Sequence, residues 1–249
     1  MSFSLARYWR DARAPRYSLS FAFPLLVLYE LLAFTLSHGE LTGVRSGADV
    51  LLKSLFLMLG GPDGLVVFGL LLVGGGAALV WRDRRRAGPI ELGYFPWMML
   101  ESGVYAVLFG GVAATITLLL LPRLGLAGSI GAGLQAGIVL GPASQLMVSL
   151  GAGIYEELLF RVILVSGLIW LGTELFRWRR NAASLFAVGL AALVFSAFHY
   201  VGPYGDHLDL RSFVFRFVAG VLFSGLYVLR GFGITAWTHA LYDVLLALR

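Results

Sequence analysis

Cysteine is absent from the 249 residues of this sequence. Its absence excludes disulfides, thiolate metal sites and cysteine nucleophiles, so any chemistry must come from carboxylates, histidines or hydroxyl groups. Charge is also scarce, because only 13% of the residues are charged, whereas a typical soluble domain has roughly 25%. The chain therefore lacks the polar surface that a water-soluble fold needs.

Apolar residues take the place of charge. They make up 59% of the chain, the mean hydropathy is +0.84, and several apolar runs reach the ~20 residues that cross a bilayer as a helix. We therefore expect an all-α fold, a polytopic transmembrane helical bundle of about 7–8 membrane helices, forming a single domain over residues 1–249. The first run has no small-residue cleavage site after it, which favours a retained span over a signal peptide.

The apolar runs predict the order of the helices. We expect membrane helices at 18–37, 64–81, 97–121, 145–176, 181–199, 212–229 and 232–248. Residues 47–59 are too short to cross and are expected to lie in the interface or dip into it. The run 145–176 is too long for one straight span, so a kink or break is expected before Tyr155. The glycine-rich stretch 124–144 is a candidate re-entrant or surface segment.

The basic residues, which give a formal net charge of +5, mark one side of the membrane. Arginines cluster at 7–16, 82–86 and 177–180, and alternating helices would place all three clusters on the same side. The positive-inside rule then predicts a cytoplasmic N-terminus, and we expect a bacterial inner or plasma membrane. No basic face interleaved with aromatics is seen, so nucleic acid is not an expected partner, and the lipid bilayer is the partner that the apolar runs require.

The stretch "IYEELLFRVIL" places three charged residues inside an apolar run. A charge in the hydrocarbon core costs roughly 2.5–3.5 kcal/mol on insertion scales, and such residues mark a site or an internal pair. Glu157 and Arg161 are four residues apart, so on an α-helix they share a face and can neutralise one another. Glu156 points about 100° away, which leaves its carboxylate available for chemistry.

Two further clusters follow in "FSAFHYVG" and "THALYDVLL". Phe195 and His199 are four residues apart, as are His239 and Asp243. An aspartate that accepts from one imidazole nitrogen fixes the tautomer and leaves the other nitrogen for a substrate, water or metal. Each cluster alone also has a structural explanation, as a buried ion pair, an interfacial histidine or a hydrogen-bonded pair between helices.

Taken in order, "EELLFR", "FSAFH" and "HALYD" resemble the motif set of the CPBP family of intramembrane proteases. This family includes the CAAX prenyl endopeptidases of the Rce1 type and the bacterial Abi proteins, and its pattern is EExxxR, then FxxxH, then HxxxN or HxxxD. The resemblance covers about the last 110 residues. The matching residues are Glu156, Glu157, Arg161, Phe195, His199, His239 and Asp243.

The resemblance implies hydrolysis of a peptide bond inside the membrane, with a membrane-associated peptide or protein as the substrate. It makes Glu156 the general base that takes a proton from water, and gives His199 the role of holding that water or stabilising the oxyanion. His239 and Asp243 complete the polar pocket. It also implies supporting roles for Glu157, Arg161 and Phe195.

A mechanism that uses glutamate alone needs no cofactor and is the one that we expect. The alternative is a divalent metal with an open position for water. Its ligands would be Glu156, His199, His239 and Asp243.

The substrate and the function class stay open at this stage. Asp243 stands where the prenyl-processing members carry asparagine, so substrates other than prenylated CAAX proteins are included, among them a bacteriocin-like peptide and a membrane-anchored sorting tail. An ion-coupled transporter and a non-catalytic membrane scaffold are the alternatives to an endopeptidase. Two other buried acids, Glu30 and Glu101, are expected either to face the same cavity or to pair within the bundle, for example with Arg216.

Overall fold

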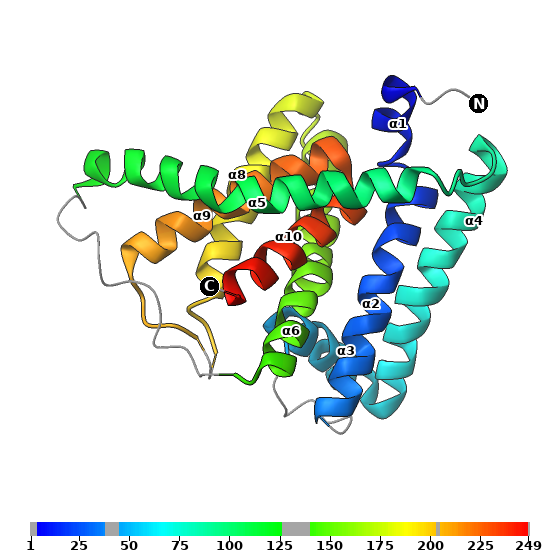
Figure 1. Cartoon of the computed structure of the whole chain (residues 1–249), viewed down its shortest axis with the longest axis horizontal. Coiled ribbons are helices and arrows are strands. Elements are labelled where there is room, and N and C mark those ends of the chain that lie inside the picture. Colours follow the sequence, from blue (N-terminus) through cyan, green and yellow to red (C-terminus); the bar gives the residue numbers. More distant parts are fainter. Residues whose placement is uncertain (1–3, 38–44, 126–139, 203–204, 249) are drawn as a thin grey trace. The chain divides into compact units, whose positions relative to one another are not determined.

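The computed structural model describes residues 4–37, 45–125, 140–202 and 205–248, and within them it contains helices and no strands. The helices appear in Figure 1 in chain order. The α-helices are α1 (Leu5–Asp11), α2 (Pro15–Ser37), α3 (Gly47–Gly69), α4 (Gly75–Ala87), α5 (Tyr94–Leu120), α6 (Pro142–Gly151), α7 (Ser166–Trp170), α8 (Arg180–Phe198), α9 (Leu210–Arg230) and α10 (Phe232–Ala247). The other helical segments are η1 (Leu70–Gly74), η2 (Pro122–Leu124), η3 (Ala152–Glu156), η4 (Leu158–Val165) and η5 (Leu171–Leu175).

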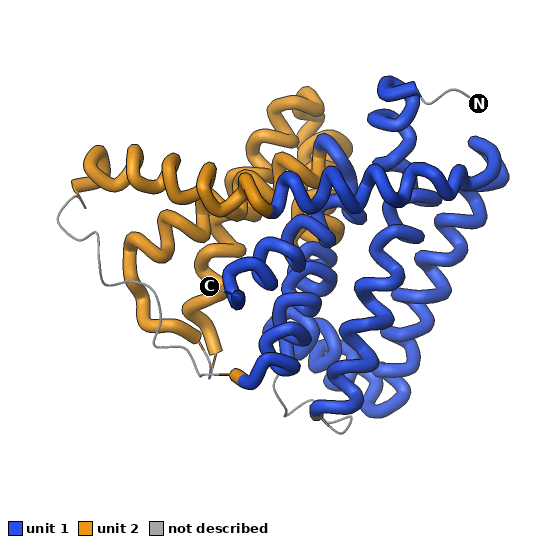
Figure 2. Tube along the Cα trace, in the orientation of Figure 1, with its two compact units in different colours: residues 1–106, 141–159, 229–249 blue, residues 107–140, 160–228 orange. Residues whose placement is uncertain are grey.

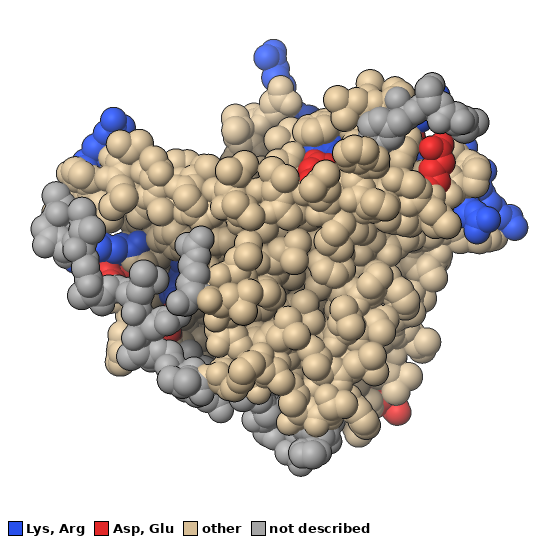
Figure 3. Space-filling view, in the orientation of Figure 1, with Lys and Arg blue, Asp and Glu red and all other residues tan. Residues whose placement is uncertain are grey.

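Six helical runs among the described residues are long and apolar enough to cross a membrane, which confirms an all-α, multi-pass integral membrane protein. They are Pro15–Leu36, Gly47–Ala87, Tyr94–Leu124, Pro142–Leu175, Arg180–Phe198 and Leu210–Arg230. The expected last span corresponds to α10, whose 16 residues are fewer than the ~20 of a typical span. Most of the surface visible in Figure 3 carries no charged side chain, as a lipid-facing surface requires.

The chain divides into two compact units, shown in different colours in Figure 2. Unit 1 comprises residues 1–106, 141–159 and 229–249, and unit 2 comprises residues 107–140 and 160–228. The first unit holds the two adjacent glutamates and the HxxxD motif, and the second holds the FxxxH motif. The glycine-rich stretch expected to be re-entrant lies for the most part outside the described residues, at 126–139.

Helical geometry is interrupted at two places, of which the second was predicted from the sequence. Gly61 has φ 57° and ψ −149°, and Pro62 follows it, so the chain kinks between the short segment 47–59 and the second span. Glycine fits here because a positive φ costs it nothing and costs other residues energy. The second interruption precedes Tyr155, where α6 gives way to the π-helical segments η3 and η4. The expected break is therefore a change of hydrogen-bond pattern within a continuous helical run.

Within unit 1, α10 packs directly against α2 and η3. The Gly233 nitrogen donates to Ser18 Oγ at 2.7 Å, and the Trp237 indole nitrogen donates to the Phe21 carbonyl at 2.7 Å. A Cβ on Gly153 would lie 2.6 Å from both the Ala236 carbonyl oxygen and the Ala240 Cβ. Small residues thus let the backbone of η3 approach α10, and this contact brings the EE motif to the helix that carries the last motif.

Ion pairs hold the arginine-rich end of unit 1 together. Arg16 Nη1 lies 3.1 Å from Asp83 Oδ2, which places the N-terminal cluster beside "RDRRR" as the alternating topology requires. Arg230 donates to both oxygens of Glu101, at 2.6 and 2.7 Å, and Tyr8 donates to Glu101 at 2.5 Å. Burial, and then the neighbouring Glu101 carboxylate, raise the pKa of Tyr8, so its phenol remains a donor.

In unit 2, α8 and α9 pack around a fully buried arginine. A Cβ on Gly220 would lie 2.9 Å from Ala192 Cα and 3.1 Å from the Phe195 ring, so α9 lies close against α8. The guanidinium carbon of Arg161 lies 4.5 Å from the Phe195 ring centroid and 5.4 Å from that of Phe223. Aromatic faces attract a cation most strongly where water is excluded, which explains why the FxxxH motif begins with phenylalanine.

Candidate active site

The EE motif lies at the junction between two π-helical segments. Glu156 is the last residue of η3, Glu157 follows it, and η4 begins at Leu158. π-helical turns are rare and occur frequently at functional sites, because the extra residue per turn re-aims the side chains that follow. At this junction Glu157 is fully buried, whereas Glu156 is partly exposed.

Glu157 is hydrogen-bonded to His239 of α10. His239 Nδ1 lies 2.7 Å from Glu157 Oε1, and the two side chains are 6% and 0% exposed. Because an ionised carboxylate only accepts hydrogen bonds, Nδ1 must carry the proton. Glu157 therefore sets the tautomer of His239, a role that the sequence had suggested for Asp243.

Asp243 stands at the other nitrogen of the same ring. Its Oδ2 lies 3.6 Å from His239 Nε2, and its side chain is 28% exposed. This separation exceeds a normal hydrogen bond of about 2.7–3.2 Å, so Asp243 stands beside the ring without a direct hydrogen bond to it. His239 thus stands between two carboxylates, one of them in direct contact.

Glu156 differs from its neighbour in having no fixed partner. Within residues 4–37, 45–125, 140–202 and 205–248, its carboxylate makes no hydrogen bond or ion pair. Its charge nevertheless acts electrostatically on both His239 and Asp243. A carboxylate that is near a histidine, partly exposed and unengaged is able to hold a water and take its proton.

His199 lies at the C-terminal end of α8, in unit 2. Its Nδ1 is 2.8 Å from the carbonyl oxygen of Phe195, which is an acceptor, so Nδ1 is the protonated nitrogen. The ring also packs edge-on against Phe195, with centroids 4.9 Å apart. The FxxxH spacing therefore fixes the tautomer of His199 and leaves its lone pair on Nε2. Phe195 also contacts Arg161, so the three supporting and catalytic candidates of this unit form one packed group.

Two predictions from the sequence concern buried charges, one for the partners of Glu30 and Glu101 and one for the pair of Glu157 with Arg161. Glu30 pairs with Lys53 and Glu101 pairs with Arg230, while Arg216 pairs with Asp206. The expectation that these acids pair within the bundle is confirmed, and the suggested partner Arg216 is wrong. The predicted neutralisation of Arg161 by Glu157 stays a prediction.

The sequence also left open a metal site. Among the residues that the structure describes, no group of three or more histidine, aspartate or glutamate side chains is arranged to hold a metal ion.

One known family resembles this region. Residues 138–245 match the family model described as type II CAAX prenyl endopeptidase Rce1-like. This segment is similar to that family. It contains all three motifs, which confirms the resemblance that they predicted. No curated protein and no solved structure matches the chain.

A polar network that is buried except at Glu30 supports the segment 138–245 from outside it. Tyr155, the residue before Glu156, donates to Glu30 of α2, and Lys53 of α3 binds Glu30 at 2.9 Å and Asp49 at 2.7 Å. Asp49 is fully buried, and the Tyr29 hydroxyl donates to it at 2.7 Å. This network ties η3 to α2 and α3, so residues of the N-terminal half position the EE motif.

Sequence reasoning missed this network for a physical reason. Lys53 and Asp49 fall in a segment interpreted as interfacial, where charges need no explanation. The i, i+4 spacing of Asp49 and Lys53 was the one available signal, since such a pair shares a helix face. Their contact with Tyr155 depends on the packing of three helices, which spacing does not encode.

Proposed function

We propose that this protein is an intramembrane endopeptidase that hydrolyses a peptide bond of a membrane-associated substrate with a water activated by Glu156. The observation that supports the proposal is the contrast between the two adjacent carboxylates. Glu157 is buried and hydrogen-bonded to His239, whereas Glu156 is partly exposed and has no hydrogen-bond or ion-pair partner among the residues that the structure describes. One carboxylate is suited to orient an imidazole, and the other is suited to act as a base.

In the proposed reaction the Glu156 carboxylate takes one proton from a water molecule, and the hydroxide oxygen adds to the scissile carbonyl carbon. The carbonyl oxygen becomes an oxyanion. His239, when Nε2 is protonated as well as Nδ1, is an imidazolium that Glu157 and Asp243 stabilise, and it donates to the oxyanion. Glu156 then returns its proton to the amide nitrogen, the C–N bond breaks, and the products are a carboxylic acid and an amine.

His199 is assigned by its motif as the second imidazole of the reaction. Its Nδ1 donates to the Phe195 carbonyl, which fixes the tautomer of the ring, and the family motif gives His199 the role of holding the water or stabilising the oxyanion. This arrangement requires no cofactor. The substrate class that the family name suggests is a prenylated CAAX peptide, and Asp243 in the place of the asparagine of prenyl-processing members extends the proposal to other membrane-anchored peptides.

We also propose that the N-terminus faces the cytoplasm. The contact of Arg16 with Asp83 joins the first two arginine clusters at one end of unit 1, as the positive-inside rule requires of a cytoplasmic face.

Incubation of the purified protein with a library of membrane-anchored peptides, prenylated and unprenylated, with and without a chelator, tests the proposal. Wild type should release defined fragments in both conditions, and Glu156→Gln should release none. Glu91→Gln, which changes an exposed carboxylate outside the motifs, is the matched control and should cleave like wild type. Cleavage by Glu156→Gln at the wild-type rate would refute the proposed role, and cleavage that the chelator stops would refute the metal-free mechanism.

A further inference from the structure

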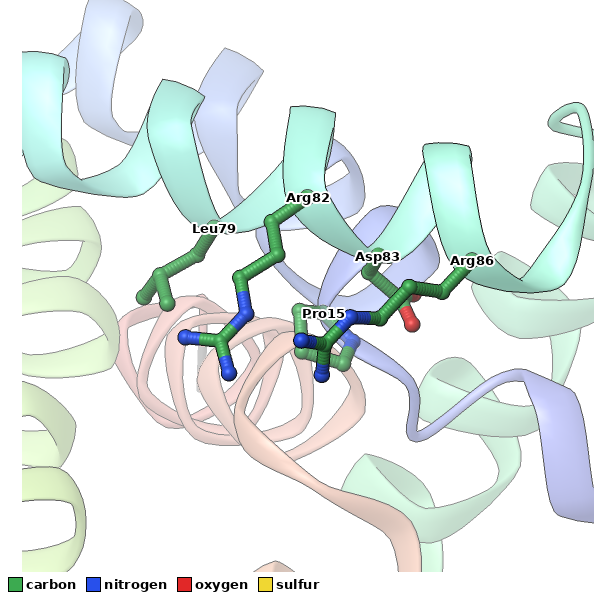
Figure 4. A pocket seen from close by; sticks show the side chains of 5 residues that line it. All are labelled: Pro15, Leu79, Arg82, Asp83 and Arg86. Carbon is green, nitrogen blue, oxygen red and sulfur yellow. The ribbon is translucent and has the colours of Figure 1, made fainter.

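A small cavity lies between the first turn of α2 and the last turns of α4, entirely within unit 1. Its volume is about 210 Å³, and Figure 4 shows the side chains around it. The lining residues are Pro15, Leu79, Arg82, Asp83 and Arg86. The lining therefore combines apolar and basic side chains. None of these residues belongs to the protease motifs or takes part in the proposed reaction.

Two arginines of this cavity are available to a ligand. Arg82 and Arg86 are four residues apart, so they lie on the same face of α4, and Figure 4 shows both side chains extending from that helix to the same side. Within the described part of the chain, neither makes a hydrogen bond or ion pair. Two adjacent guanidinium groups match the oxygens of a phosphate group, which they bind with paired hydrogen bonds.

The one acid of the cavity is already neutralised. Asp83 Oδ2 accepts from the side chain of Arg16 at 3.1 Å and from the Arg16 backbone nitrogen at 3.1 Å. An anion in the cavity therefore meets two unpaired cations and a carboxylate whose charge a buried arginine compensates. Arg84 and Arg85, in the same helical turn, add further positive charge near the opening.

The cavity lies where the apolar surface of α4 ends. Leu79 and Trp81 are exposed, and the guanidinium of Arg85 stacks on the Trp81 ring at 3.9 Å from its centroid. Tryptophan with arginine is the composition of a membrane–water interface. A molecule bound here would place its polar group against Arg82 and Arg86 and an apolar chain along Leu79.

From these observations we infer that the cavity binds the phosphate group of an anionic phospholipid. A free phosphate shares the charge but makes no use of the apolar wall at Leu79. A zwitterionic phospholipid carries a compensating cation, which the four arginines of residues 82–86 would repel. The bound lipid bridges the ends of α2 and α4.

Native mass spectrometry of the delipidated protein tests the inference, with phosphatidylglycerol, phosphatidylcholine or inorganic phosphate as the added probe. Wild type should bind one phosphatidylglycerol in preference to the other two probes. The double variant Arg82→Gln/Arg86→Gln should bind it about 30-fold more weakly, since each interfacial arginine contributes about a 5-fold gain in affinity for anionic lipid. The double variant Arg84→Gln/Arg85→Gln removes the same charge outside the cavity and should lose only a few-fold.

Each other outcome overturns the inference. Equal losses in the two double variants would mean that a diffuse basic surface, and no defined site, attracts the lipid. Unchanged binding of phosphatidylglycerol by Arg82→Gln/Arg86→Gln would show that these two arginines do not bind the lipid. Binding of phosphatidylcholine or of inorganic phosphate as tight as that of phosphatidylglycerol would show that the ligand is not an anionic lipid.

Discussion

Replacing Gly153 by alanine adds a methyl group where η3 touches α10. The new Cβ would lie 2.6 Å from the Ala236 carbonyl oxygen, 2.6 Å from the Ala240 Cβ and 2.9 Å from the Ala240 nitrogen. Two of these atoms belong to backbone, so no side-chain rotation relieves the overlap and α10 must move. Overpacking of this kind costs about 1–3 kcal/mol, against the ~1 kcal/mol that alanine gains over glycine in a helix.

Reversible unfolding in mixed micelles measures this balance, with Gly103→Ala as the control. A Cβ on Gly103 meets nothing within 4 Å, so this variant should be as stable as wild type or up to ~1 kcal/mol more stable. Gly153→Ala should be less stable than Gly103→Ala by about 1–3 kcal/mol. Its cleavage rate should also fall, because α10 carries His239. If the two variants unfold alike, the close approach of η3 to α10 is not present in the protein.

Three further changes test the buried polar contacts by the same unfolding measurement. Asp49→Asn should lower the free energy of unfolding by about 3–5 kcal/mol, because it removes the buried carboxylate that Arg45 and Lys53 contact at 3.0 and 2.7 Å. A loss below ~1 kcal/mol would contradict the network. Arg230→Met should lower the free energy of unfolding by a similar amount. The double variant Arg230→Met/Glu101→Leu should recover most of that loss. If the losses of the two single variants instead add up in the double variant, the two residues are not paired. Glu157→Gln should lower the free energy of unfolding by about 1.5–3 kcal/mol, and Glu156→Gln should lower it by less than ~0.5 kcal/mol. A larger loss in Glu156→Gln than in Glu157→Gln would show that Glu156, and not Glu157, is the buried and hydrogen-bonded carboxylate.

The helical architecture could be predicted because it depends on local properties of the chain. Apolar runs of sufficient length located α5, α8 and α9 to within a few residues. The motif spacing likewise gave the order of the candidate site residues. These features need no knowledge of which helices are neighbours.

The partners of the buried charges could not be predicted in the same way. The spacing places Glu157 and Arg161 on one helix face, but it does not reveal the contact of Glu157 with His239, 82 residues away. The attachment of Tyr155 to Glu30 likewise depends on tertiary packing. Periodicity assigns a side chain to a helix face, and only the packed structure shows what that face meets.

The single-turnover cleavage rate of Glu156→Gln, measured at saturating peptide, tests the proposed reaction most directly. The substitution keeps the shape of the side chain and removes its basicity. The rate should fall by about 10²–10⁴, the usual contribution of a general base, while peptide affinity stays within a few-fold of wild type because the base acts only in the chemical step. A rate within a few-fold of wild type, at unchanged affinity, would contradict the assignment of Glu156 as the residue that activates water.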